Sequence, residues 1–230
     1  MMANAAAERP LSGNVKAYKG MGMDGFTARW YAKNTANLME DYRADARRVA
    51  ALLGPKSKVL EVAPGPGYFA VELAKLGDFA IVGLDISKTC VEIARENAAK
   101  SGVRAEFRQG NAAEMPFGDE EFDFLFCRAA FKNFSEPIRA LQEMRRVLKP
   151  GGRALIVDLR RDATPGAIDE AVSKTNLGWF DRILTRLTFR HMLVKRAYTS
   201  SAFRQMVTAA EFQTIRVEEG LIGLDVWLKK

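Results

Sequence analysis

A glycine turn between a strand and a helix is the segment of this sequence best suited to chemistry. The turn, Ala63-Pro64-Gly65-Pro66-Gly67, follows the apolar run Lys58 to Val62 and precedes a helical pattern at Tyr68. Glycine lets a backbone approach a ligand without a Cβ, and the first N–H groups of the helix face the turn. Asp85 closes the next predicted strand, where a carboxylate can accept hydrogen bonds from both hydroxyls of a ribose. We therefore expect a nucleotide-type site in the crevice at the carboxyl ends of the strands.

Two classes of cofactor use such a turn. The dinucleotide fingerprint requires Gly-x-Gly-x-x-Gly, whereas the residue three positions after Gly67 is Ala70. NAD is therefore the less favoured alternative.

The segment resembles the first motif of the class I S-adenosylmethionine-dependent methyltransferases, and it is most similar to the group that includes ubiquinone and menaquinone biosynthesis enzymes. That motif runs acid, any, Gly, any, Gly, any, Gly, and this chain places Glu61, Ala63, Gly65 and Gly67 there. Ala63 departs from the first glycine, which adds a methyl group beside the cofactor path and is expected to leave the backbone donors intact. The resemblance spans residues 56–158 strongly and 199–230 loosely.

The resemblance implies S-adenosyl-L-methionine as cofactor and assigns it contacts along the strand ends. Glu61 would contact the methionine amino end directly or through water, and Asp85 would bind the ribose. Gly110-Asn111-Ala112 stands where the family has Gly-Asp-Ala. The remaining implied cofactor-binding positions are Ile86 on adenine, Asn111 at the adenine amine, Ala112, and Cys127 beside the transferable methyl group. Less specific roles stay open, with Glu61 a strand-end acid, Asp85 a helix cap and Asn111 a turn residue.

Short β-branched runs alternate with helical patterns through the middle of the chain, which is typical of βαβ units. We predict an α/β fold with a Rossmann-like, seven-stranded, mostly parallel sheet, an antiparallel C-terminal hairpin and helices on both faces. The predicted strands are Lys58 to Val62, Phe79 to Asp85, Val103 to Gln109, Phe122 to Cys127, Arg153 to Asp158, Gln213 to Glu218 and Leu224 to Lys229. The predicted helices are one or two within Ala28 to Leu53, then Tyr68 to Leu76, Ser87 to Ser101, Ser135 to Leu148 with Ser135 as N-cap, a helix starting at Thr164-Pro165, Leu177 to Arg196 and Ser201 to Ala210.

The 230 residues are expected to form a single domain with decorations. We divide it into an N-terminal cap (residues 1–55), a cofactor-binding core (56–158), a helical lid insertion (159–198) and a C-terminal helix and hairpin (199–230).

Methyl transfer from a sulfonium is an in-line displacement that needs alignment more than a catalytic residue. Where an acceptor needs a base, His191, the single histidine, is the first candidate. Helical spacing places it on the apolar stripe of Phe180, Ile183, Leu184 and Leu187. A packed histidine is the more frequent role of such a residue. Weaker candidates are Tyr18, Tyr31 and Tyr198.

Several acceptor classes do not match the sequence. Cys127-Arg128-Ala129-Ala130 follows the fourth strand in place of the Asn/Asp-Pro-Pro-aromatic motif of base amine methylation. Cys90 and Cys127 form no CxxC pair, so we expect no metal site, disulfide or thiol redox centre. What remains is a small or medium organic acceptor, apolar or aromatic, beneath a lid rich in large apolar side chains. Those side chains, which could equally form lid core or a homodimer contact, are Met21, Met23, Phe26, Trp30, Trp179, Phe180, Phe189 and Met192.

The net charge of +7 favours anionic partners without forming a polybasic tail. This charge leaves nucleic acid possible without implying it, and the missing base-methylation motif makes nucleic acid an unlikely partner. Arg182, Arg186 and Arg190 make a basic stripe, more often a solvated face than a surface for phosphate or an anionic membrane. The sequence shows no export signal or membrane-spanning run, so a cytoplasmic location is expected. A cofactor-binding regulatory or scaffolding protein without turnover, or an RNA or protein methyltransferase, remains the alternative function.

Overall fold

The fold is a seven-stranded mixed sheet in the order β3-β2-β1-β4-β5-β7-β6. A computed structural model describes residues 18–19, 22, 24–35, 38–173 and 193–230. β1 to β5 run parallel, and β7 lies antiparallel between β5 and β6. This confirms the predicted fold class. The strands are β1 (Lys58–Val62), β2 (Ala80–Asp85), β3 (Glu106–Gln109), β4 (Phe122–Arg128), β5 (Leu148–Leu159), β6 (Thr214–Glu219) and β7 (Gly223–Lys229).

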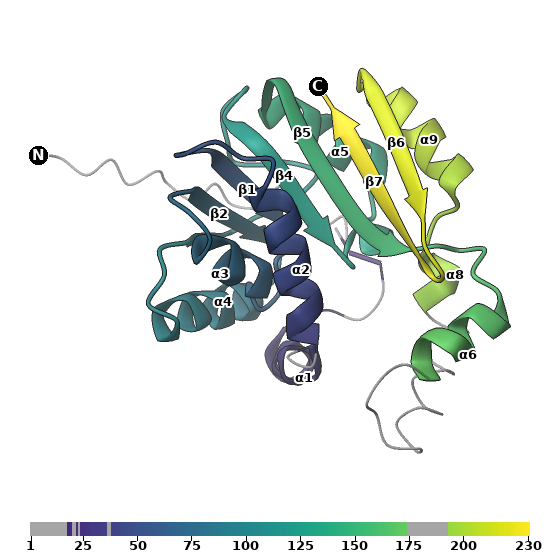
Figure 1. Ribbon diagram of the computed structural model, residues 1–230, viewed down its shortest axis with the longest axis horizontal. Coiled ribbons are helices and arrows are strands. Elements are labelled where there is room, and N and C mark those ends of the chain that lie inside the picture. Colours follow the sequence, from purple (N-terminus) through teal and green to yellow (C-terminus); the bar gives the residue numbers. More distant parts are fainter. Residues whose placement is uncertain (1–17, 20–21, 23, 36–37, 174–192) are drawn as a thin grey trace, which may run out of the picture.

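Helices cover both faces of the parallel strands (Figure 1). α2 (Met39–Ala50), α3 (Tyr68–Ala74) and α4 (Lys88–Lys100) enclose one apolar cluster against one face of the sheet. α5 (Pro137–Val147) and α9 (Ser200–Ala209) enclose the other. Because both faces are packed, the central strands are nearly continuous apolar runs rather than alternating ones.

The remaining helices lie beyond the carboxyl ends of the parallel strands, as Figure 1 shows for α1 and α6. They are α1 (Gly25–Thr35), the short 3₁₀ helix η2 (Phe131–Asn133), α6 (Pro165–Ser173) and α8 (Val194–Arg196). The predicted N-terminal helical region therefore contains two helices. None of the helices formed by the described residues is long and apolar enough to cross a membrane.

Three local predictions were wrong. α5 begins at Pro137 with Glu136 as N-cap, so the predicted cap at Ser135 is displaced by one residue. Proline at the first helical position supplies the helical φ and needs no N–H partner. β3 begins only at Glu106, because the N–H of Val103 still closes the end of α4 on Ala98. β5 begins already at Leu148, because Leu148 pairs with Phe122 across a register shift.

Arg128 connects α2 to the sheet through hydrogen bonds. It ends β4, and its guanidinium donates hydrogen bonds to Asp45 and, at 3.2 Å, to Asp41 of α2. The same guanidinium lies over the ring of Tyr42. α2 is thereby held against the carboxyl end of a central strand.

Candidate functional site

The glycine turn lies where β1 ends and α3 begins, and its N–H groups are already bonded within the protein. Ala63 donates to the carbonyl of Leu84 (2.8 Å), and Gly67 donates to that of Pro64 (3.0 Å). The N–H of Gly65 donates to the carboxylate of Asp85. The prolines between them have no N–H. These three N–H groups are therefore engaged within the protein, and the turn itself contributes space for a close approach.

Three residues of the turn adopt positive φ: Ala63 (+56°), Gly65 (+54°) and Gly67 (+73°). A Cβ at Gly67 would lie 2.8 Å from that of Ala94 and 2.9 Å from the ring of Phe107, so this glycine packs α3 against its neighbours. A Cβ at Gly65 would meet only the ring of Tyr31, at 3.4 Å. Gly65 is thus the open position of the turn, and Ala63 keeps its conformation at a steric cost that glycine would not have.

Asp85 ends β2 and faces the turn. One carboxylate oxygen accepts the N–H of Gly65 at 2.9 Å, and the other accepts the N–H of Ser87 at 2.9 Å. Ser87, not Asp85, is the N-cap of α4, with its hydroxyl accepting the N–H of Cys90. Burial raises the pKa of Asp85 to about 6, with Asp24 nearby adding to that rise. The carboxylate is therefore buried between the glycine turn and the start of α4.

Glu61 lies inside β1 and is buried. Its carboxylate accepts the N–H of Ala70 at 3.1 Å, in the first turn of α3. The N-cap of that helix is Gly67, which has no side chain to cap it. Burial raises the pKa of Glu61 well above its ordinary value, and the charge of Asp85 acts in the same direction. Glu61 is therefore both a helix cap supplied by a strand and an acid beside the site.

The other predicted cofactor-binding residues lie after β2, after β3 and near the end of β4. Ile86 and Ala112 are half-buried. The side-chain oxygen of Asn111 accepts the N–H of Ala113 at 2.9 Å, so Asn111 is a turn residue whose oxygen retains one acceptor position. The thiol of Cys127 is packed in the apolar core, and burial raises its pKa. A buried, protonated thiol is unsuited to act as a nucleophile.

Two of the three candidate tyrosines reach this end of the sheet from the N-terminal segment. Tyr31 of α1 lies against Gly65, and burial raises its pKa to about 12. Tyr18 pairs through its backbone with Phe134, and the charges of Asp85 and Asp158 act on its phenol. The hydroxyl of the third, Tyr198, accepts a hydrogen bond from Lys19 at 2.9 Å.

A buried ion pair at this edge is not among the site residues predicted from the sequence. Lys132 of η2 and Asp158 of β5 are 4% and 5% exposed, with Nζ and Oδ1 2.9 Å apart. Lysine and aspartate are rarely buried unless paired. Lys132 and Asp158 are 26 residues apart, so no periodicity in the sequence connects them. The one signal is that Asp158 ends the fifth predicted strand, as Asp85 ends the second.

His191 lies outside the described residues. So do the predicted basic stripe and several apolar lid residues, namely Arg182, Arg186, Arg190, Met21, Met23, Trp179, Phe180, Phe189 and Met192. Phe26 and Trp30 of α1 are exposed. Among the described residues, no group of three or more His, Cys, Asp or Glu side chains is placed to hold a metal ion.

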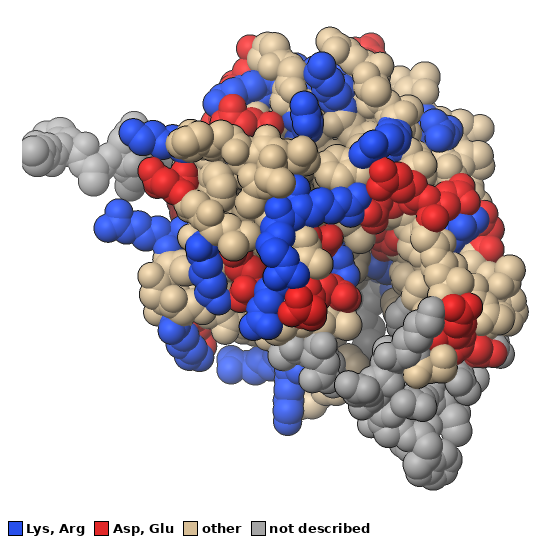
Figure 2. Space-filling view, viewed as in Figure 1, with Lys and Arg blue, Asp and Glu red and all other residues tan. Residues whose placement is uncertain are grey.

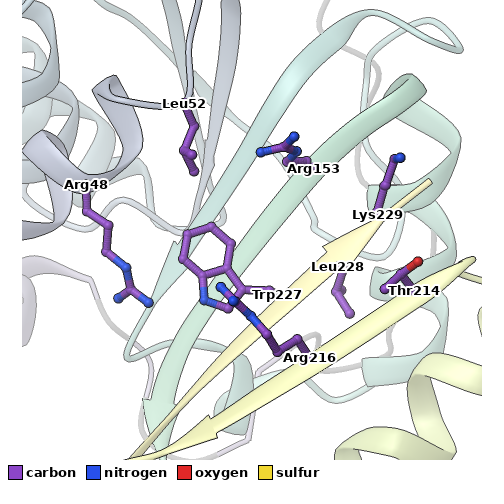
Figure 3. Close-up of a pocket in the computed structure, with 8 residues that line it drawn as sticks. All are labelled: Arg48, Leu52, Arg153, Thr214, Arg216, Trp227, Leu228 and Lys229. Carbon is purple, nitrogen blue, oxygen red and sulfur yellow. The ribbon is translucent and has the colours of Figure 1, made fainter.

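A cavity of about 500 Å³ lies elsewhere, at the amino end of β5, away from the glycine turn. Figure 3 shows the indole of Trp227 close to Arg48 and Arg216, whose guanidinium groups lie 4.7 and 5.6 Å from its ring centre. Both arginines also pair with Glu218. The cavity is lined by Arg48, Leu52, Arg153, Thr214, Arg216, Trp227, Leu228 and Lys229.

Basic and acidic side chains are interspersed on the face seen in Figure 2. On α2, Arg43 and Arg47 are exposed and both pair with Glu40. Arg43 and Arg47 therefore form part of a solvated face of α2.

The middle of the chain is similar to proteins of known family. Residues 60–156 match the family model described as a methyltransferase domain. The chain is 33% identical over 149 residues to the demethylmenaquinone methyltransferase of Deinococcus radiodurans, covering 64% of this chain and 56% of that protein. It is 30% identical over 165 residues to the demethylmenaquinone methyltransferase of Chlorobaculum parvum, covering 71% and 65%. The matches thus span about half to two thirds of these relatives' length.

The fold has solved counterparts. A protein of Methanococcus maripaludis assigned as an S-adenosyl-L-methionine-dependent methyltransferase superposes with a TM-score of 0.70 over 96% of this chain and 97% of its own, at 22% identity. An S-adenosylmethionine-dependent methyltransferase of Aquifex aeolicus superposes with a TM-score of 0.63 over 86% and 97%, at 21% identity. At these identities the likeness shows the fold. Residues 60–156 thus match the methyltransferase domain family, and the chain has the fold of the class I S-adenosylmethionine-dependent methyltransferases.

Proposed function

We propose that this protein transfers a methyl group from S-adenosylmethionine to a small or medium organic acceptor of apolar or aromatic character. The observation that carries the proposal is the position of Asp85, whose carboxylate ends β2 directly beside the open Gly65 of the turn after β1. In parallel sheets the crevice at the carboxyl ends of the strands is where ligands bind.

The residues present fit this cofactor. An ionised carboxylate oxygen can accept about two hydrogen bonds. Backbone N–H groups from Gly65 and Ser87 donate to the two oxygens of Asp85, which leaves acceptor capacity for a ribose hydroxyl. The missing side chain at Gly65 leaves room for the ligand that a Cβ would narrow.

The other roles follow from the family resemblance and the positions of the residues. Glu61 would bind the methionine amino end, Ile86 would pack on adenine, and Asn111 would accept from the adenine amine with its remaining lone pair. S-adenosylmethionine supplies a methyl group bonded to a positively charged sulfur. The acceptor would attack the methyl carbon in line and displace the sulfur. The protein's part is alignment and exclusion of water, for which Tyr31 over Gly65 is well placed.

The acceptor class is supported by two observations. The relatives named demethylmenaquinone methyltransferases act, by that name, on a demethylmenaquinone, which is an apolar aromatic molecule. Large apolar side chains are concentrated in the N-terminal cap and the lid insertion of this sequence. His191 as a base, a homodimer and a cytoplasmic location stay predictions.

Calorimetry separates the cofactor classes. We expect heat of binding from S-adenosylhomocysteine and none from NAD. Binding of NAD without binding of S-adenosylhomocysteine would overturn the proposal.

Turnover then tests the acceptor. The protein is incubated with methyl-labelled S-adenosylmethionine and a cell extract, and the extract is fractionated into small organic molecules, RNA and protein. Label in the organic fraction supports the proposal, whereas label in RNA or protein replaces the acceptor class. Cofactor binding with no label in any fraction indicates a regulatory or scaffolding protein.

A further inference from the structure

The buried Lys132–Asp158 pair is held by an unusually complete set of hydrogen bonds. One oxygen of Asp158 accepts from the ammonium of Lys132 (2.9 Å) and from the N–H of Leu159 (2.8 Å). The other accepts the backbone N–H of Lys132 at 2.8 Å. The ammonium also donates to the carbonyl of Ala129, a residue with a positive φ of +55°. The position of the cation is therefore fixed by η2, β5 and the end of β4 together.

Among the described residues, one donor of this ammonium has no acceptor. A lysine ammonium has three N–H groups. Two are directed at Asp158 and Ala129, and the described residues provide no acceptor for the third. Burying an ion pair removes both ions from water, and replacing such a pair by apolar residues is often neutral for stability. Stability alone therefore does not explain why a charged pair is buried at this position.

The pair lies at the carboxyl ends of β4 and β5, on the other side of β1 from β2 and Asp85. Asp158 is near the carboxyl end of β5, and Lys132 follows the carboxyl end of β4, which is the strand next to β1 and its glycine turn. The segment at Tyr18 and Lys19 crosses η2, with the N–H of Lys19 bonded to the carbonyl of Asn133 at 2.7 Å. Burial raises the pKa of Tyr18, and the charges of Asp85 and Asp158 both add to that rise.

We propose that the third N–H of Lys132 binds an oxygen of the methyl acceptor and favours its anionic form, so that the acceptor is a phenol or an enol that reacts as its anion. This inference rests on the proposed function and narrows its acceptor class. The hydroxyl proton leaves to solvent, and the electron pair of the anion forms the new bond to the methyl carbon. The bond from that carbon to sulfur breaks, with its electron pair staying on sulfur. The attacking atom is either the oxygen or a ring carbon that shares its charge.

The test uses 4-nitrophenol, whose anion absorbs visible light, bound to the full chain in the presence of S-adenosylhomocysteine. A fixed cation within about 4–6 Å lowers the pKa of an acid by about 1 to 3. We expect the bound probe to ionise at a pH lower than the free probe by that amount. The titratable or charged groups near Lys132 come from every neighbouring element. They are Asp158 on β5, Cys127 on β4, Glu61 on β1, Tyr18 in the N-terminal segment and Arg196 on α8.

Three variants make the result specific. Lys132→Met with Asp158→Asn removes both charges and keeps an oxygen for one of the two backbone N–H groups, so that no charge is left buried alone. Lys132→Arg keeps the cation. Lys149→Met is the matched control, because Lys149 pairs with Asp123 at the opposite end of the sheet. The ionisation shift should be lost in the double variant, retained in part in the arginine variant and unchanged in the control.

Each outcome is decisive. An unchanged shift in the folded double variant, or failure of the wild-type complex to bind the probe, overturns the inference. Calorimetry with S-adenosylhomocysteine is run on the same proteins and should give equal affinities for wild type and double variant. Loss of cofactor binding in the wild type would instead contradict the proposed function, so the two failures are distinguishable.

Discussion

Asp85 and Gly65 are joined by a hydrogen bond of 2.9 Å from the backbone N–H of the glycine to the carboxylate. The acid proposed to bind the ribose therefore also holds the turn beneath it. Recognition of the cofactor and the shape of the turn are coupled through one side chain, so a change at Asp85 acts on both.

Asp85→Asn should weaken S-adenosylhomocysteine binding by about 1.5 to 3 kcal/mol, the range for a hydrogen bond that involves a charged group. The amide keeps an oxygen for the N–H of Gly65 or Ser87, so the turn should hold better than in Asp85→Ala. Calorimetry on both variants measures the loss. Unchanged affinity in a folded Asp85→Asn protein would show that another group recognises the ribose.

The same residue predicts a pH dependence of stability for the free protein. Burial raises the pKa of Asp85 from 3.8 to about 6. Between these values the folded state keeps a proton that the unfolded state has lost, so ionisation of Asp85 destabilises the fold as the pH rises. Going from about pH 7 to about pH 5 should stabilise the wild type by about 1 kcal/mol relative to Asp85→Asn. Urea unfolding of both proteins at each pH checks the difference, and parallel curves would contradict it.

The sequence predicted the frame of the site because local patterns determine it. Glu61 and Asp85 each lie in a strand that an apolar run reveals, and the glycines between them interrupt the helical pattern. The sequence could not show that the N–H of Gly65 donates to Asp85, because that bond joins segments 20 residues apart. Lys132 was missed for the same reason, since only the packing of η2 on β5 removes it from solvent.

Gly67→Ala and Gly65→Ala separate packing from backbone conformation. Both residues have positive φ, so both substitutions cost about 1 to 2 kcal/mol in backbone strain. Only at Gly67 does the added Cβ come within 2.8 Å of Ala94, which adds about 1 to 3 kcal/mol. Urea unfolding should therefore rank Gly67→Ala as the less stable variant. Equal stability would mean that α3 and α4 can move apart freely.

Glu61→Gln should separate stability from cofactor binding. The glutamine oxygen can still accept the N–H of Ala70, so the cap of α3 survives. Because burial raises the pKa of Glu61, the neutral amide should leave the free energy of unfolding at neutral pH unchanged or higher. Affinity for S-adenosylhomocysteine should fall about tenfold or more, since the methionine amino group loses a charged partner.

Glu61→Ala is the control, because it removes the cap as well as the charge and should cost about 0.5 to 2 kcal/mol of stability. Calorimetry and urea unfolding on the three proteins give both quantities. If Glu61→Gln bound S-adenosylhomocysteine as tightly as the wild type, the acid would serve only to cap α3. A loss of stability in Glu61→Gln as large as in Glu61→Ala would instead show that the cap depends on the negative charge at the helix N-terminus.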